Sequence, residues 1–244
     1  MIPKTIHYCW FGRKPLPELA LKCIASWKKF LPDHEIKEWN EDNFDVNQIP
    51  YTAQAYQCRK FAFVSDYARF KIMYEYGGIY FDTDVEVIKP LDKIINNGPF
   101  FGIEPSTTGG LCAPGLGFAC SRGLDLCKEM INHYENDMFI LPNGKYNLTT
   151  VVENFSKILK EKGFSLSSFP EEFNGIHIYP PEYFCPINYH TREKKITKNT
   201  YTIHHYASSW VNKYDNLSLV AKIWKFFHLP NTNIRARIKQ KFIK

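Results

Sequence analysis

The order of the expected elements predicts an α/β fold for this chain of 244 residues, and two further observations indicate a folded domain of ordinary size. First, β-prone runs alternate with stretches of helical periodicity along the N-terminal part of the sequence. Second, an apolar content of 44% and an aromatic content of 16% suffice for a packed core and argue against disorder. Third, the length fits one large domain, or one domain with a small appendage.

The first expected strand covers residues 4–11, where β-prone side chains run up to Gly12. Residues 17–30 follow as a helix, with a proline at its start and apolar residues at helical spacing. Residues 34–39 alternate like a strand and end at the polar turn 40–43. The order strand, helix, strand is the opening of an α/β domain of the nucleotide-binding kind.

Residues 60–76 form the next expected helix, which two glycines end. At about 100° per residue, its lysines and Glu75 share one solvated sector. Asp66 and Arg69, with Ser65 beside them, fall roughly opposite, so we expect them to be enclosed. A buried acid and a buried guanidinium are costly unless they pair or bind a ligand. Both interpretations stay open here: a purely structural Asp–Arg pair, or a pair that holds a ligand.

A short apolar strand is expected at Ile79–Phe81, and it leads directly into Asp82 and Asp84. A D-x-D motif alone is a weak signal, because a turn whose acids accept backbone N–H groups gives the same pattern. Its position after an apolar strand strengthens the signal. Two carboxylates this close repel unless a cation lies beside them, and oxygen ligands suit Mg²⁺ or Mn²⁺ bound to phosphate. The sequence therefore predicts a divalent-metal site that holds a diphosphate.

The rest of the chain continues the alternation. A short helix is expected after Pro90, and a glycine-containing loop at 106–110 falls where a loop covering a substrate could lie. Thr149 or Thr150 is the expected N-cap, and Gly163 the C-cap, of one later helix. The remaining expected strands are the stretch that follows Asp84 and ends before Pro90, together with 98–104, 115–121, 176–180 and 200–206. The remaining expected helices are 121–134, 149–163 and 217–228.

Three stretches together resemble a known enzyme family. They are IPKTIHYCWFG at 2–12, ASWKKFLPDHEIKEWNEDNF at 25–44 and FVSDYARFKIMYEYGGIYFDTDVEV at 63–87. The pattern resembles glycosyltransferase family 32, the DXD sugar-binding family that includes fungal initiating mannosyltransferases and bacterial capsule and lipopolysaccharide enzymes. It is similar, more distantly, to the glucosylating domains of large bacterial toxins. The likeness is close over residues 1–90 and returns at 204–210.

The resemblance implies a GT-A fold, a Rossmann-like α/β sandwich with a mixed sheet, as a single domain with a C-terminal helical tail. The expected glycosyltransferase domain is 1–216. Within it, 1–104 would bind the nucleotide sugar and 105–216 would supply the acceptor side and a closing loop. Residues 217–244 would form a basic amphipathic helical tail.

By resemblance, Trp10 would stack on the nucleotide base, although its position after a first strand is by itself typical of a core residue. Asp66 would contact the ribose or donor sugar, Arg69 the donor sugar, and Tyr80 would lie near the same pocket. From the pattern alone, His7 is expected to be structural. Trp27 and Trp39 are expected in the core by their helical and strand spacing.

The resemblance also supplies the metal and diphosphate site. Asp82 would face the ribose and the metal, and Asp84 would bind the metal directly, so Asp66, Arg69 and Asp84 are the expected catalytic residues. Ser209 and Trp210 would close over the diphosphate. The third protein ligand stays open among His204, His205 and Ser209, since imidazole is acceptable to Mn²⁺.

The expected function is a retaining, metal-dependent hexosyltransferase. Its donor would be a nucleotide sugar, UDP-hexose in preference to GDP-mannose, and its cofactor Mn²⁺ or Mg²⁺. The acceptor would be a glycan or lipid-linked oligosaccharide in bacterial surface polysaccharide synthesis. The alternative is a metal-dependent phosphohydrolase acting on a nucleotide-type substrate, which usually needs additional Asp and His ligands. Nucleic-acid binding is not expected, because 25 acids balance most of the 31 basic residues and no such motif appears.

We expect a cytoplasmic protein, because the sequence shows no targeting signal and its cysteines do not suggest disulfides. No apolar run of about 18 residues and no signal peptide appears, and seven cysteines without a CxxC pair are expected to be reduced thiols. The segment 234–244 holds five Lys or Arg residues and no acid. A basic amphipathic tail could lie on the inner face of the membrane, or pack on the domain as a solvated helix, and the pattern leaves both open.

Overall fold

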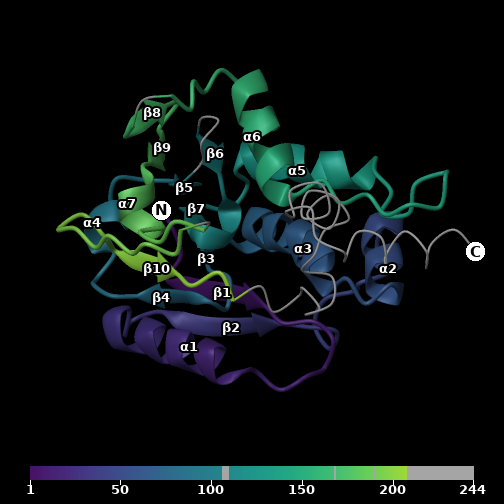
Figure 1. The fold of residues 1–244 in the computed structure, drawn as a ribbon, viewed down its shortest axis with the longest axis horizontal. Coiled ribbons are helices and arrows are strands. Elements are labelled where there is room, and N and C mark those ends of the chain that lie inside the picture. The colour runs from purple at the N-terminus through teal and green to yellow at the C-terminus, as the bar shows by residue number, and fades with distance from the viewer. Residues whose placement is uncertain (106–109, 168, 190, 208–244) are drawn as a thin grey trace, which may run out of the picture. The chain divides into compact units, whose positions relative to one another are not determined.

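The computed structural model describes residues 1–105, 110–167, 169–189 and 191–207 (Figure 1). The expected helix 217–228, the basic tail 217–244, and Ser209 and Trp210 lie outside the described residues. So does most of the expected loop at 106–110.

A mixed eight-stranded sheet forms the centre of the described fold, in the order β2-β1-β3-β7-β5-β9-β8 with β6 added to β5. Strand β1 pairs in parallel with β2 and β3, whereas β7 is antiparallel to both β3 and β5. The predicted α/β class with a mixed sheet is confirmed. The strands of this sheet are β1 Thr5–Cys9, β2 Glu35–Trp39, β3 Gly78–Tyr80, β5 Phe100–Glu104, β6 Leu111–Cys112, β7 Phe118–Cys120, β8 Glu171–Phe173 and β9 Ile176–Tyr179.

A second sheet has two strands, β4 Val85–Val87 and β10 Thr202–His204, which pair antiparallel. Helices cover the main sheet on both faces, with α1 on one side and α3, α5 and α6 on the other (Figure 1). The helices are α1 Glu18–Phe30, α2 Pro50–Gln57, α3 Phe61–Tyr76, α4 Asp92–Ile95, α5 Asp125–Glu135, α6 Val151–Glu161 and α7 Pro181–Phe184, with a 3-10 turn η1 at Pro114–Leu116.

Alternating side chains of the central strands feed two separate cores. On β3, Ile79 packs into the core beneath α1, whereas Tyr80 packs into the core beneath α3. Neighbouring strands repeat the division, with Phe100 on the α1 side and Phe101 on the α3 side. Because side chains alternate along a strand, a sheet covered on both faces needs apolar residues at consecutive positions. This requirement explains the apolar strand that precedes the D-x-D motif.

Two glycines connect α3 to β3 without a loop. Gly77 ends the helix with φ +64 and donates its N–H to the Met73 carbonyl. A Cβ on Gly78 would lie 2.5 Å from the Thr5 carbonyl oxygen, so only glycine allows β3 to approach β1 this closely. The D-x-D motif is therefore held at a fixed distance beyond a rigid helix and a buried strand.

Several predicted elements differ in detail from the structure. The strand expected at 115–121 begins as the turn η1, because Pro114 occupies the first position of a 3-10 turn, and only Phe118–Cys120 pairs in the sheet. The expected helix 121–134 starts later, at Asp125. Thr150 is the N-cap of α6 and forms a capping box with Glu153, and its C-cap is Lys162.

The burial of the aromatic residues agrees with the predictions. Trp27 and Trp39 are both in the core, as expected. Helix α2 was not predicted, since it has only eight residues. None of the helices within the described parts of the chain is long and apolar enough to span a lipid bilayer.

Candidate metal and donor site

Asp82 and Asp84 lie in the tight turn that joins β3 to β4, where the main sheet gives way to the small one. The Val85 N–H donates to the Asp82 carbonyl at 3.1 Å and closes the turn. The Asp82 N–H donates to the Gly115 carbonyl at 3.3 Å and ties the turn to η1. These two backbone hydrogen bonds help to fix the turn that carries both carboxylates.

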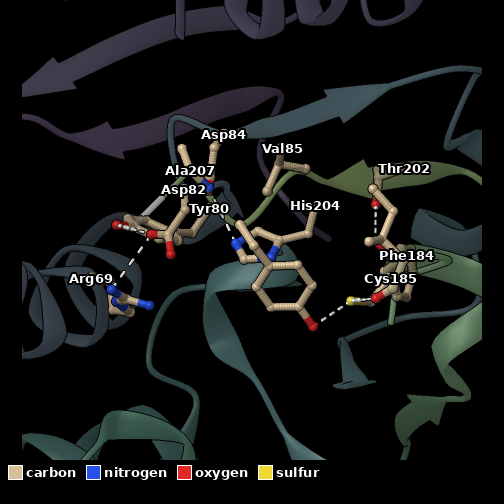
Figure 2. Close-up of polar contacts among 12 residues, drawn as sticks. Arg69, Tyr80, Asp82, Asp84, Val85, Phe184, Cys185, Thr202, His204 and Ala207 are labelled. Carbon is tan, nitrogen blue, oxygen red and sulfur yellow. Dashed lines mark hydrogen bonds and ion pairs between the residues drawn. The ribbon is translucent and has the colours of Figure 1, made fainter. Parts of the chain in front are cut away.

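The carboxylate of Asp84 is held by the end of β10 (Figure 2). His204 Nε2 lies 3.2 Å from Asp84 Oδ1, and the Ala207 N–H donates to Asp84 Oδ2 at 2.8 Å. The backbone N–H of His205 donates to the Asp84 carbonyl at 3.0 Å. A segment far along the chain thus supplies three contacts to one residue of the motif.

Asp82, Asp84 and His204 form a cluster whose possible ligand atoms all lie within 4.8 Å of one another. Two carboxylates and an imidazole are a donor set that Mn²⁺ accepts. His204 Nε2 faces Asp84, and its Nδ1 atom is buried with no hydrogen-bond partner among the described residues. These residues fit a divalent metal ion.

The electrostatics of the pair also fit a cation site. Burial alone would lower the pKa of His204, but the adjacent Asp84 carboxylate overcomes it and raises this pKa to about 10. Burial would likewise raise the pKa of Asp84, yet His204 and the hydrogen bond from Ala207 bring it below the ordinary value. Without a metal ion, a proton on His204 therefore supplies the positive charge that this carboxylate requires.

The predicted enclosure of Asp66 and Arg69 is borne out by their burial, since their exposed fractions are 7% and 4%. Arg69 Nη2 lies 2.9 Å from Asp66 Oδ1 and 3.5 Å from Asp82 Oδ1, and the Tyr80 hydroxyl donates to Asp82 Oδ1 at 3.0 Å. Burial raises the pKa of Asp66 to about 7, and the guanidinium offsets only part of this. The structural Asp–Arg pair does form, and its guanidinium also reaches the Asp82 carboxylate.

Gly115 is a site residue that the sequence analysis missed. A Cβ at this position would lie 2.2 Å from Asp82 Oδ2 and 3.4 Å from Arg69 Nη1. Glycine is therefore required for η1 to pack against the Asp82 carboxylate. Because Gly115 is far from Asp82 in the sequence, only the antiparallel pairing of β3 with β7 brings the two together.

A second group of unpredicted residues lies on the other side of His204. The Tyr206 ring is 4.4 Å from the His204 ring, and its hydroxyl is 2.9 Å from Cys185 Sγ. Glu104, at the end of β5, is half-buried, and burial raises its pKa while His204 partly offsets the rise. These residues interact electrostatically with the cluster, but no local sequence pattern marks them.

Trp10 follows β1 and is half-buried, and its indole Nε1 donates to the Lys14 carbonyl at 2.6 Å. The adjacent Cys9 interacts electrostatically with Arg69 and Asp82, which brings the end of β1 to the same region. Base stacking by Trp10 stays a prediction. His205 forms a hydrogen bond with Glu86, not with Asp82 or the Asp84 carboxylate, which leaves His204 as the third member of the cluster within the described residues.

Comparison with known proteins finds a family model that matches part of this chain. Residues 17–101 match the family described as "Glycosyltransferase sugar-binding region containing DXD motif". The chain carries a glycosyltransferase DXD region. The resemblance to glycosyltransferase family 32 is thereby confirmed over these residues, which include Asp66, Arg69 and both acids of the motif.

Similar proteins with known names are fungal mannosyltransferases. The chain is 29% identical over 117 residues to inositol phosphoceramide mannosyltransferase 1 of Schizosaccharomyces pombe, which covers 43% of this chain and 34% of that protein. It is 29% identical over 119 residues to the initiation-specific alpha-1,6-mannosyltransferase of Candida albicans, covering 45% of this chain and 31% of that protein. The chain thus spans about a third of the length of the relatives it matches.

Two solved structures are similar to this chain. One is the PaToxG glycosyltransferase, with 18% identity and a TM-score of 0.47, covering 66% of this chain and 70% of that one. The other is a glycosyltransferase involved in the glycosylation of the major capsid of PBCV-1. Its identity is 13% and its TM-score 0.45, covering 85% of this chain and 95% of that one.

Proposed function

We propose that this chain is a metal-dependent, retaining glycosyltransferase that moves a hexose from a nucleotide sugar to a glycan or lipid-linked oligosaccharide. The observation that carries the proposal is the convergence of Asp82, Asp84 and His204 within 4.8 Å, beside the buried pair of Asp66 and Arg69. The family match supports the reaction class, because it describes a sugar-binding region with a DXD motif.

In this proposal Asp82, Asp84 and His204 hold Mn²⁺ or Mg²⁺. The ion, when bound, neutralises the diphosphate leaving group of the donor. The chain's own contribution is to fix the three ligands before the donor arrives. Asp82 is oriented by Tyr80 and Gly115, and Asp84 is oriented by the end of β10.

The donor sugar would lie against Asp66 and Arg69. Arg69 is held by the Ser65 carbonyl, by Asp66 and by Asp82, so its guanidinium is fixed before a sugar hydroxyl reaches it. Asp66 would stabilise the positive charge that develops at the anomeric carbon. We favour attack of the acceptor hydroxyl on the same face of the sugar from which the phosphate departs, so the anomeric carbon keeps its configuration. The departing phosphate takes the proton of the acceptor hydroxyl. Trp10, Ser209 and Trp210 would complete the donor site by base stacking and closure over the diphosphate.

The finer identity of substrates is part of the same proposal. A UDP-hexose is the preferred donor, and the names of the fungal relatives add GDP-mannose to the panel to be tested. Bacterial surface polysaccharide is the proposed acceptor class. The chain would act in the cytoplasm, with domain 1–216 carrying the site and the basic segment 217–244 contacting the inner membrane face.

The test compares Asp84→Ala with the parent chain, using UDP-hexoses and GDP-mannose with and without Mn²⁺. Loss of Asp84 is expected to abolish transfer and donor hydrolysis alike. Asp33→Ala is the matched control, since this carboxylate is exposed and pairs with Lys4 at 3.6 Å. Thermal shift with each donor gives a second measurement, because a true donor stabilises the fold by mass action.

Two results would contradict the proposal. Full activity of Asp84→Ala in saturating Mn²⁺ would remove the metal site. Release of inorganic phosphate, in place of free UDP or GDP and sugar, would indicate a phosphohydrolase. That class usually uses a two-metal cluster, and only the Asp–Asp–His group appears within the described residues.

A further inference from the structure

Strand β4, which follows the D-x-D motif, is held along its other edge by side chains and not by another strand. On α1, Trp27 Nε1 donates to the Val85 carbonyl at 2.7 Å, and Ser26 Oγ accepts from the Val87 N–H at 2.9 Å. Strand β10 pairs with the opposite edge. The small sheet therefore has only two short strands, which makes its own contribution to holding β10 in place weak.

A charged cluster links the same three elements. Glu86 Oε2 lies 3.1 Å from Lys22 Nζ on α1 and 2.8 Å from His205 Nε2 at the end of β10. The Glu86 and His205 side chains are 20% and 21% exposed, whereas Lys22 is 60% exposed. Because a carboxylate only accepts, His205 Nε2–H is the donor, and a hydrogen bond to a partly buried charged group is among the stronger ones.

Consecutive residues at the end of β10 project to opposite sides of an extended chain. The His205 ring reaches Glu86, and the His204 ring reaches Asp84. Rotation of the chain at one of these residues must therefore move the other. The backbone hydrogen bond from His205 N–H to the Asp84 carbonyl, at 3.0 Å, lies between the two contacts.

We propose that Glu86 is a positioning residue, which anchors His205 and thereby fixes the imidazole of His204 toward Asp82 and Asp84. This inference rests on the proposed function, in which His204 is a metal ligand. Glu86 does not touch the metal site itself. Glu86 instead acts through the backbone between His205 and His204 and so sets the orientation of the His204 ring. Removing a residue that orients a metal ligand typically weakens metal binding.

The test measures Mn²⁺ affinity by the electron paramagnetic resonance signal of free Mn²⁺, on the full chain. Glu86→Ala is expected to weaken binding by about 10-fold or more. Glu86→Gln keeps an oxygen that accepts from His205 and is expected to recover most of the affinity. Ser26→Ala is the matched control, because it also removes a contact to β4 but leaves the link to His205 intact.

A metal-free measurement separates this inference from the proposed function. Long-range ¹H–¹⁵N spectra of the histidine rings, with His204 assigned through His204→Gln, report the ring environment directly. We expect the His204 signals to shift or broaden in Glu86→Ala and to stay at their parent positions in Ser26→Ala.

Each outcome decides one of the two ideas. If the parent chain binds no Mn²⁺ while Glu86→Ala still shifts the His204 signals, the metal function fails and the positioning role stands. If the parent binds Mn²⁺ and Glu86→Ala matches it in affinity and spectra, the positioning role is wrong. Equal weakening by Glu86→Ala and Glu86→Gln would also overturn it, because loss of charge alone would then explain the effect.

Discussion

Gly115→Ala tests whether the metal site depends on the close packing of η1 against Asp82. The added Cβ would lie 2.2 Å from Asp82 Oδ2, whereas ordinary contacts begin at 3.4 Å. Asp82 must therefore move by about 1 Å, a misplacement that can cost about 100-fold in rate. The carboxylate cannot rotate freely away, since Tyr80 and Arg69 hold its other oxygen at 3.0 and 3.5 Å.

The same substitution is expected to have a smaller effect on folding. The φ of Gly115 lies outside the left-handed region, so alanine adds crowding but no backbone strain. Overpacking of this kind typically costs about 1–3 kcal/mol. Gly102→Ala is the matched control, because its Cβ would lie 2.7 Å from Phe184 Cδ2 in buried β5, without contact to Asp82.

The assay measures donor hydrolysis with Mn²⁺, as free nucleoside diphosphate, together with the thermal midpoint of each variant. Gly115→Ala is expected to lose about 100-fold in rate, and Gly102→Ala to lose stability with little loss of rate. The reasoning is refuted if Gly115→Ala retains the parent rate, or if both variants lose rate in proportion to their loss of stability.

Two further predictions concern stability. Arg69→Met leaves Asp66 buried without its cation and is expected to lower the free energy of unfolding, measured in urea, by about 3–5 kcal/mol. Lys71→Met breaks a more exposed pair with Glu75 and is expected to cost about 0.5 kcal/mol. Equal urea midpoints for the two variants would contradict this prediction. Burial, with a smaller effect of nearby charge, lowers the pKa of His7 from 6.5 to about 4, so the folded chain binds fewer protons and stability falls by about 3 kcal/mol as pH drops through this range. Urea titrations of the parent and His7→Gln between pH 7 and pH 4 check it, and an identical pH dependence in both chains would refute it.

The hydrogen bonds of His7 also indicate a neutral ring. Trp39 Nε1 donates to His7 Nδ1 at 3.0 Å, and His7 Nε2 lies 2.9 Å from the Gly77 carbonyl. The first bond requires Nδ1 to accept, and the second requires Nε2 to carry the proton. A second proton would therefore displace the indole, which supports the expectation that His7 is structural and neutral.

The first half of the site could be predicted because its determinants are local. Periodicity and motif spacing reveal these determinants, because they lie in consecutive segments of the sequence. They are the enclosed sector of the helix, the apolar strand and the two acids. That Asp66 and Arg69 form a pair was also predictable, since residues three apart face the same side of a helix.

The remainder depends on pairings between distant segments. The choice of His204 over His205 follows from the register of β10 on β4, in which His204 is opposite Val85. Two adjacent histidines carry no local signal of which one will face the acids. Gly115 and Glu104 likewise join the site only through the order of the sheet, which a single sequence does not reveal.

The pairing of β10 with β4 has a consequence during synthesis of the chain on the ribosome. His205 and Glu86 are 119 residues apart, so both acids of the motif emerge well before the imidazole that completes the cluster. Chains fold from the N-terminal end while synthesis continues. If His204 completes the proposed metal site, an unfinished polypeptide would have both acidic side chains but would lack the imidazole until translation had passed β10.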